Sequence, residues 1–239
     1  MYVIINVSVI QGDKGKCVKL LKIVKLLLAI PLVALALHTT SAISLGICAI
    51  LFIILLFDFI MIDKGKNDYA DLYHSAYYDS LTGIPNRLNA DLFVAGCSSP
   101  DSLSVIIADL DGLKAANDTF GHYAGDILIK SFATLFFQAA QPDGFAARNG
   151  GDEFLAIFPD DGNGFKARIY CEKLRRAVAA HNISAVYPVS YSIGYACGSD
   201  GSCKTIQQLI STADDRMYEK KKAKKEHTDS APDSCEGRR

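Results

Sequence analysis

Acidic residues of the types used in metal chemistry gather at two places in the sequence. Asp109 and Asp111 lie at the end of an apolar run, and Asp152 and Glu153 follow two glycines in the stretch RNGGDEFLAIF, 148–158. Carboxylates without a neighbouring His or Cys offer the hard oxygen ligands that Mg²⁺ and Mn²⁺ prefer. A divalent ion held in this way leaves coordination positions for phosphate oxygens. The two acidic groups therefore indicate a phosphoryl-transfer site, if the fold brings them together.

Two strand-like runs would have to bring these acids together. The β-branched run 104–110 predicts a buried strand, and the runs FAAR and EFLAIF on either side of the glycines predict a β-hairpin. Asn149–Gly150 or Gly150–Gly151 would supply the positive φ angles of a tight hairpin turn. If the strands are neighbours, the carboxylates converge at one edge of the sheet. If they are not, each acid is an ordinary turn or cap residue.

The other elements of this region alternate between helical and strand-like patterns. Apolar residues at helical spacing predict helices over 87–95, 125–140, 164–181 and 205–225, and an alternating run predicts a strand over 189–196. This order of elements predicts an α+β fold in which helices flank a central, mostly antiparallel sheet.

The stretch DGLKAANDTFGHYAGD, 111–126, contains groups suited to a nucleotide. Backbone N–H groups from Gly112 onward and the ammonium of Lys114 could hold phosphates. Asn117 and Asp126 have the donor and acceptor types needed to read a guanine edge. On composition alone, a stretch rich in Asp, Asn and Gly is equally typical of a plain surface loop.

Charge and cysteine content narrow the function classes. The net charge is −1, and the first 57 residues contain five lysines and one acid, so the rest of the chain is mildly acidic. Such a body argues against nucleic-acid binding, which uses a basic face. The seven cysteines form no C-x-x-C pair, which is typical of free thiols in a reducing compartment. A Cys197–Cys203 pair is the alternative.

The N-terminal part contains a long uncharged run. No Asp, Glu, Lys or Arg occurs from 26 to 57, and about 20 apolar residues suffice to cross a membrane. We expect a transmembrane hairpin with spans at about 20–37 and 42–62. The lysines outside both spans place the two ends in the cytoplasm, which predicts a protein of the cytoplasmic membrane with its main domain in the cytoplasm. One long tilted span or a cleaved signal peptide are the alternatives.

The expected domain organisation follows from these patterns. It consists of a basic N-terminal segment, a membrane region, a helical linker, a catalytic domain and a disordered tail, at 1–19, 20–62, 63–78, 79–225 and 226–239.

Five stretches in order along 79–225 resemble the GGDEF-domain diguanylate cyclases: DSLTGIPNR, ADLDGLKAANDTFGHYAGD, RNGGDEF, SYSIGYA and ADDRMYEKKKAKK. The resemblance, to a membrane-anchored member, implies condensation of two GTP molecules to cyclic di-GMP with loss of two pyrophosphates. It also implies a homodimer in which each subunit holds one GTP and each ribose hydroxyl attacks the α-phosphate of the opposite nucleotide. A catalytically silent GTP-binding or signalling module is the alternative, and a membrane scaffold that only dimerises is a third.

The resemblance implies a role for each matching residue. Asp109, Asp152 and the Leu110 carbonyl would bind Mg²⁺ or Mn²⁺, and Glu153, with Asp152 and Lys114, would serve catalysis. The implied substrate-binding residues are Gly112, Leu113, Lys114, Asn117, His122, Asp126, Arg148, Lys221 and Lys225. The signature residues are Gly150, Gly151, Asp152, Glu153 and Phe154.

The chain departs from the family pattern in three places. Gly112–Leu113 stands where the family often has an aromatic pair, and the late A-K-x-x-G-R pattern reads KKKAKK, so that Lys225 replaces an Arg. An Arg-to-Lys change loses bidentate phosphate geometry. Gln141 and Gly144 replace the Arg and the Asp, respectively, of the R-x-x-D product-inhibition site, so we expect no inhibitory site there.

Overall fold

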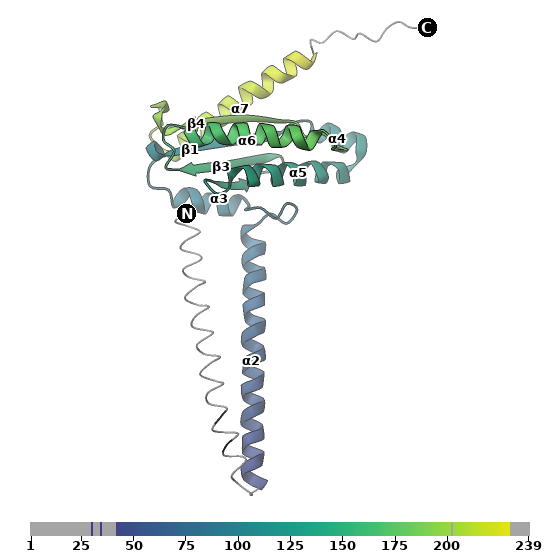
Figure 1. Cartoon of the computed structure of the whole chain (residues 1–239), viewed down its shortest axis with the longest axis vertical. Coiled ribbons are helices and arrows are strands. Elements are labelled where there is room, and N and C mark those ends of the chain that lie inside the picture. The colour runs from purple at the N-terminus through teal and green to yellow at the C-terminus, as the bar shows by residue number, and fades with distance from the viewer. Residues whose placement is uncertain (1–29, 31–33, 35–41, 202, 230–239) are drawn as a thin grey trace, which may run out of the picture. The chain divides into compact units, whose positions relative to one another are not determined.

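The structure is a computed structural model of the 239-residue chain, and it describes residues 30, 34, 42–201 and 203–229 (Figure 1). The chain divides into two compact units, Met1–Ala76 and Tyr77–Arg239. Each unit is described by itself.

The described part of the first unit lies almost entirely in the helix α2, Ala42–Tyr77. The predicted helical linker 63–78 is helical as far as Tyr77 and forms the last part of α2, while Tyr78 forms an isolated bridge with Pro85. Several large apolar side chains in the first half of α2 are exposed, among them Ile50, Ile53 and Phe57.

The expected transmembrane hairpin is not confirmed. In the part of the chain that the structure describes, no helix combines the length and the apolarity needed to cross a membrane. The expected span 42–62 falls on α2, where Asp58 interrupts the uncharged run, with Asp63 and Lys64 following close behind. The expected span 20–37 lies outside the described residues, apart from two isolated positions.

The second unit is built on a four-stranded sheet in the order β2-β3-β1-β4. The strands are β1 Leu103–Leu110, β2 Phe145–Arg148, β3 Glu153–Pro159 and β4 Tyr191–Cys197. Every pairing between neighbours is antiparallel, as the sequence predicts. β1 lies between β3 and β4 and is buried along its whole length, which explains its continuous apolar run.

The helices of this unit agree closely with the predicted ranges. They are α3 Arg87–Ala95, α4 Leu113–Phe120, α5 His122–Ala140, α6 Phe165–Asn182 and α7 Ile206–Asp229, with short 3₁₀ turns η1 Pro100–Ser102 and η2 Gly198–Asp200. α7 continues past the expected end at 225, and the remaining expected tail, 230–239, lies outside the described residues. α4 is a helix that the sequence analysis did not expect.

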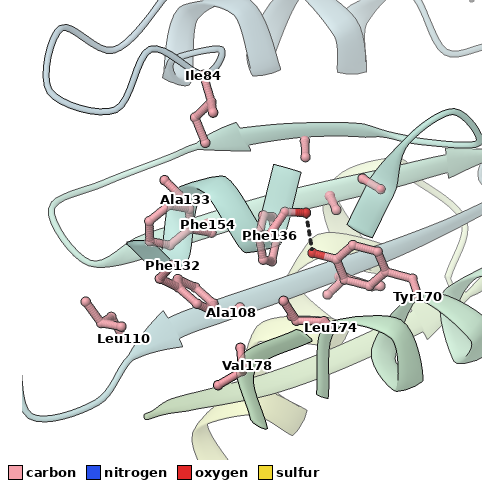
Figure 2. Packing of buried hydrophobic residues seen from close by; sticks show 14 of the residues in the cluster. Ile84, Ala108, Leu110, Phe132, Ala133, Phe136, Phe154, Tyr170, Leu174 and Val178 are labelled. Atoms are coloured by element: carbon pink, nitrogen blue, oxygen red, sulfur yellow. Dashed lines mark hydrogen bonds between the residues drawn. The ribbon is translucent and has the colours of Figure 1, made fainter. Parts of the chain in front are cut away.

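Aromatic side chains from β3, α5 and α6 form the centre of the main core (Figure 2). The Phe132 ring meets the Phe154 ring edge-on, with 4.8 Å between centroids, and Phe136 packs edge-on against Tyr170. The buried Tyr170 hydroxyl donates to the Phe136 carbonyl at 3.2 Å, so its polar atom is satisfied. Burying a ring of this size contributes about 1.5–3 kcal/mol. The core therefore joins α5 and α6 firmly to the sheet.

α7 packs against β4 through a glycine. A Cβ on Gly194 would lie 2.1 Å from the Ala213 carbonyl oxygen and 2.4 Å from the Met217 amide nitrogen. Only a residue without a side chain lets the helix backbone approach the strand this closely. The middle of α7 is thereby fixed on the sheet.

Candidate active site at the acidic edge of the sheet

The pairing of β1 with β3 brings the two acidic groups together. Asp109 lies opposite Glu153 in the register, and the Leu110 amide donates to the Asp152 carbonyl at 2.9 Å. The predicted convergence of these carboxylates at one sheet edge is confirmed. We call Asp109, Asp152 and Glu153 the acidic edge.

Asp109 is a buried acid in a field of negative charge. Only 8% of the residue is exposed. Burial raises the pKa of its carboxyl, and the charges of Asp152 and Asp111 raise it further, while Lys221 opposes the change. The Lys221 Nζ lies 2.5 Å from the Asp109 Oδ1. Partial burial lowers the pKa of Lys221, but its contact with Asp109 and the charges of Asp152 and Asp111 outweigh this and raise it.

The donor set of the acidic edge fits a hard divalent cation. Within the described residues, no group of three or more His, Cys, Asp or Glu side chains could hold a metal ion. The edge instead offers the carboxylates of Asp109 and Asp152 and the nearby Leu110 backbone. Mg²⁺ is usually held by one or two carboxylates together with substrate phosphates and water, so two acids suffice.

The signature turn differs from the expected tight hairpin. Neither Gly150 nor Gly151 has a positive φ angle, so that prediction is wrong. The turn is longer than two residues, because the Asn149 and Gly150 amides both donate to the Glu153 carbonyl, at 2.8 and 3.2 Å. A Cβ on Gly150 would lie 2.8 Å from the Glu153 Oε2. Gly150 thus makes room for the Glu153 carboxylate to fold back over the turn.

Arg148 holds the signature turn in place. Its Nη2 donates to the Gly151 carbonyl at 2.8 Å, its Nε donates to the Gly150 carbonyl at 3.1 Å, and its Nη1 contacts the Asp79 Oδ1 at 2.9 Å. Burial raises the pKa of Asp79, but hydrogen bonds from Thr82 and Arg148 outweigh it and lower the pKa. The implied role of Arg148 in substrate binding stays a prediction, and the sequence analysis missed its partner Asp79.

Asp111 is held by protein groups. The Ser190 and Ser192 hydroxyls donate to its carboxylate at 2.9 and 2.8 Å, and the Lys224 Nζ lies 3.0 Å away. Burial raises the pKa of Asp111, but these three donors outweigh it and lower the pKa. Of the two acids at the end of β1, Asp109 therefore faces Asp152 while Asp111 is bound to β4 and α7.

The stretch 111–126 forms a corner between α4 and α5. Gly112 caps α4 with a φ of 73°, a left-handed conformation that suits glycine, and the first turn of α4 presents the Leu113 amide. Among the described side chains, the buried Asn117 Oδ1 has no hydrogen-bond partner. It lies only 2.0 Å from where a Cβ of Gly125 would be, next to Asp126. Asn117 thus lies against the residue that precedes Asp126 in α5.

Two predicted site residues have exposed side chains, and a third is not described. Lys114 on α4 and His122 at the start of α5 are exposed. The side chain of Lys225 lies outside the described part of the structure. Their implied roles stay predictions.

A separate cavity of about 500 Å³ lies beside the far end of β4, lined in part by Arg168, Tyr195 and Arg216. Two acids line it, Asp200 and Glu219, and Asp200 is already paired with Arg216 at 2.7 Å. The cavity lacks the converging carboxylates of the acidic edge, so the acidic edge is the better candidate for phosphate chemistry.

Comparison with known proteins supports the same region. The sequence profile of the family described as "Diguanylate cyclase, GGDEF domain" matches residues 76–227, more than half of the chain. The chain is 32% identical over 158 residues to the diguanylate cyclase DgcS of Shewanella oneidensis, covering 64% of this chain and 52% of that protein. It is 30% identical over 168 residues to the diguanylate cyclase VdcA of Vibrio cholerae, covering 67% and 48%. The chain thus spans about half the length of these relatives.

The fold is also similar to that of a solved structure. The coiled coil and GGDEF domain of DgcB from Caulobacter crescentus, crystallised in complex with c-di-GMP, superposes with a TM-score of 0.60 at 23% identity. The match covers 72% of this chain and 95% of that chain. At this identity the likeness concerns the fold.

Proposed function

The chain belongs to the GGDEF domain family of diguanylate cyclases, and on that basis we propose that it condenses two GTP molecules to cyclic di-GMP and two pyrophosphates. The observation that carries the proposal is the β1–β3 register, which sets Asp109 beside Asp152 and Glu153 at one sheet edge. All three acids of the signature chemistry are present. A silent module would more typically have lost one of them.

The corner between α4 and α5 supports the choice of a guanine nucleotide. The buried Asn117 Oδ1 needs a donor, and an amide oxygen accepts hydrogen bonds from N–H groups. Guanine carries such a donor in its exocyclic amino group. Asp126, which follows Gly125 in α5, is proposed to offer a carboxylate for a second guanine N–H.

The start of α4 supports phosphate binding. Backbone N–H groups at a helix N-terminus attract anions. Here those of Gly112 and Leu113 come three and four residues after Asp109 of the acidic edge. Lys221, already beside Asp109, is placed to bind a triphosphate that arrives there. Lys114 and Lys225 are proposed to add charge from the same two helices.

The protein groups divide the chemical work. Asp109 and Asp152, with the Leu110 carbonyl, would hold Mg²⁺ or Mn²⁺, which when bound polarises the α-phosphate and neutralises the leaving pyrophosphate. Glu153 is exposed and folded back over Gly150, and we propose that it accepts the proton of the attacking ribose hydroxyl. Arg148 keeps the turn that carries Asp152 and Glu153 rigid.

Each domain would present one GTP, so the reaction needs two domains face to face. Bringing two bound reactants together supplies much of the rate, because their entropy is lost on binding. We therefore propose that the active species is a homodimer. Cyclase activity per subunit should rise with protein concentration until dimerisation is complete.

Product inhibition through an R-x-x-D site is not expected. A Cβ on Gly144 would lie 2.4 Å from the Phe158 ring, so an acidic side chain at this position would collide with the core. Gln141 likewise supplies no guanidinium group. Added cyclic di-GMP should leave the initial rate unchanged.

We also propose that the chain resides at the cytoplasmic membrane, with its catalytic domain in the cytoplasm. The support is the sequence alone: the uncharged run 26–57 with lysines before it. Fractionation of cells that express the full chain or a form lacking residues 1–62, which removes both expected spans, tests this. Equal amounts of both forms in the soluble fraction would contradict it.

The activity is tested on the purified full-length chain with GTP and Mg²⁺, beside the Asp152→Ala variant. We expect cyclic di-GMP from the wild type and none from the variant. GTP binding without product in both would instead identify a silent GTP-binding module.

A further inference from the structure

The C-terminal half of α7 ends beside the acidic edge. Its middle is fixed on β4, where Gly194 admits the backbone and the Arg216 Nη1 donates to the Tyr195 carbonyl at 2.8 Å. Beyond Arg216 the helix continues toward β1. Two lysines in its last described turns, Lys221 and Lys224, reach the end of that strand.

Lys224 makes several contacts at once. Its Nζ lies 3.0 Å from the Asp111 Oδ2, donates to the Tyr191 carbonyl, and lies 5.8 Å from the centroid of the Tyr191 ring. A single exposed ion pair contributes little to stability. Here the Asp111 side chain is just 18% exposed, and two serine hydroxyls fix it from β4 and its approach. The acceptor is therefore rigid, and the contact holds a helix to a sheet.

Lys221 lies one turn before Lys224 on the same face of α7. Residues three apart on a helix are neighbours, so a displacement of the last turn moves both lysines. Asp109 and Asp111 are also close together at the end of β1. The two ion pairs, Lys221–Asp109 and Lys224–Asp111, thus share a helix and a strand.

The pairs differ in what they leave available. Asp109 belongs to the acidic edge, so the Lys221 contact has to change when a cation and a triphosphate bind there. Asp111 accepts from two serine hydroxyls and from Lys224, and these contacts need not change when the ligands bind. Lys224 can therefore keep α7 in place while Lys221 exchanges its partner.

We propose that Lys224 is a positioning residue, which anchors the end of α7 on Asp111 and so holds Lys221 where it meets the GTP phosphates. This inference rests on the proposed function. In the A-K-x-x-G-R pattern, position 224 is the glycine, so the anchor is a feature of this chain and not of the pattern.

The test uses the full-length chain with Mg²⁺ and the non-hydrolysable analogue guanosine 5′-[α,β-methylene]triphosphate, titrated by calorimetry. Lys224→Met should weaken binding about fivefold, and the KM for GTP should rise by the same factor with less than about a twofold change in kcat. Lys224→Arg should restore most of the affinity. Lys222→Met is the matched control, because Lys222 is exposed on the same helix and its Nζ lies 4.0 Å from the Glu226 Oε1. This variant should bind the analogue like the wild type and keep the same KM for GTP.

A double-mutant cycle shows whether Lys224 acts through Lys221. In a Lys221→Met background, Lys224→Met should weaken analogue binding no further. Additive losses, or a Lys224→Met variant that binds like Lys222→Met, would overturn the inference. Should Lys224→Met fail to fold, Asp111→Asn removes the same anchor and should give the same rise in KM.

The outcomes for the two proposals are separable. If the losses of analogue binding are non-additive but the wild type makes no cyclic di-GMP, the role of Lys224 is supported and the proposed cyclase activity is contradicted. If the wild type makes cyclic di-GMP but the two substitutions have additive effects on binding, the cyclase activity is supported and the role of Lys224 is contradicted.

Discussion

The two ends of β1 each bury an acid, and they treat it differently. Near the start of the strand, the Ser104 hydroxyl donates to the Asp161 Oδ2 at 2.6 Å. Asp161 also accepts the Lys166 and Ala167 amides, both at 2.9 Å, and is 3% exposed. Near the other end, Asp109 is 8% exposed, meets a lysine ammonium and is repelled by a neighbouring carboxylate.

The difference lies in where the partners come from. Two of the donors to Asp161 are backbone amides in the first turn of α6, so this acid acts as a helix cap and cannot be released without unfolding that turn. The partner of Asp109 is a long side chain that can rotate away. A buried acid with backbone donors serves the fold, and one with an exchangeable partner is available to a ligand.

The largest expected effect is on activity at the acidic edge. Asp109→Asn keeps the shape of the side chain but removes the charge that would bind the cation, so cyclic di-GMP formation should fall by about 10³-fold or more. The rate is measured by chromatography of the product at saturating GTP. Activity within tenfold of the wild type would show that Asp109 does not serve the reaction.

The matching change at the other end should affect stability. Asp161→Ala leaves the Ser104 hydroxyl and two amides without their acceptor, and we expect the free energy of unfolding to fall by about 3 kcal/mol. Below its unfolding transition the variant should keep a kcat within about twofold of the wild type. A variant that is stable in urea titration but inactive would show that Asp161 serves the reaction and not the fold.

A smaller effect is expected at the signature turn. Arg148→Met removes the donors to the Gly150 and Gly151 carbonyls, and loosening this turn should lower kcat about tenfold. Asp79→Asn retains those donors and weakens only the ion pair, so it should lower kcat by about threefold or less. Equal losses from both variants would indicate that the ion pair, and not the turn, matters.

The smallest expected effect is on the free energy of unfolding, which decreases when the buried Asp109 carboxyl ionises. Its pKa is raised above the ordinary value of 3.8 by burial and by Asp152, so the folded chain binds a proton at higher pH than the unfolded chain does. Ionising Asp109 as the pH rises therefore lowers stability. In EDTA at pH 7, Asp109→Asn should therefore raise the free energy of unfolding.

This gain has a defined pH dependence. It should shrink as the pH falls through the raised pKa of Asp109 and vanish below about 3.8, where both states of the wild type are protonated. Urea titrations at several pH values measure it. A gain that persists unchanged at low pH would rule out the charge as its cause.

Much of this arrangement could be predicted from the sequence. The apolar run of β1 and the runs on either side of the glycines indicate strands by composition, and their pairing brings the acids together as expected. The periodic helices α3, α5, α6 and α7 follow from apolar spacing. These features depend on local patterns that burial on one face imposes.

The features that were missed depend on contacts between distant segments. α4 was missed because its Asn and Asp residues and the glycines on either side of it, Gly112 and Gly121, are typical of a loop. The long signature turn depends on where the Glu153 carboxylate folds, and not on glycine conformation alone. The pairing of Lys224 with Asp111 links residues far apart in the chain, and the basic run around it has the composition of a solvated helix surface.

The acidic edge is proposed to condense two GTP molecules into one product. The most direct measurement is the ratio of pyrophosphate to cyclic di-GMP released by the full-length chain, with Mg²⁺ and again with excess EDTA. We expect two pyrophosphates per cyclic di-GMP with Mg²⁺ and neither product in EDTA. Bound GTP with no cyclic di-GMP at any protein concentration would contradict it.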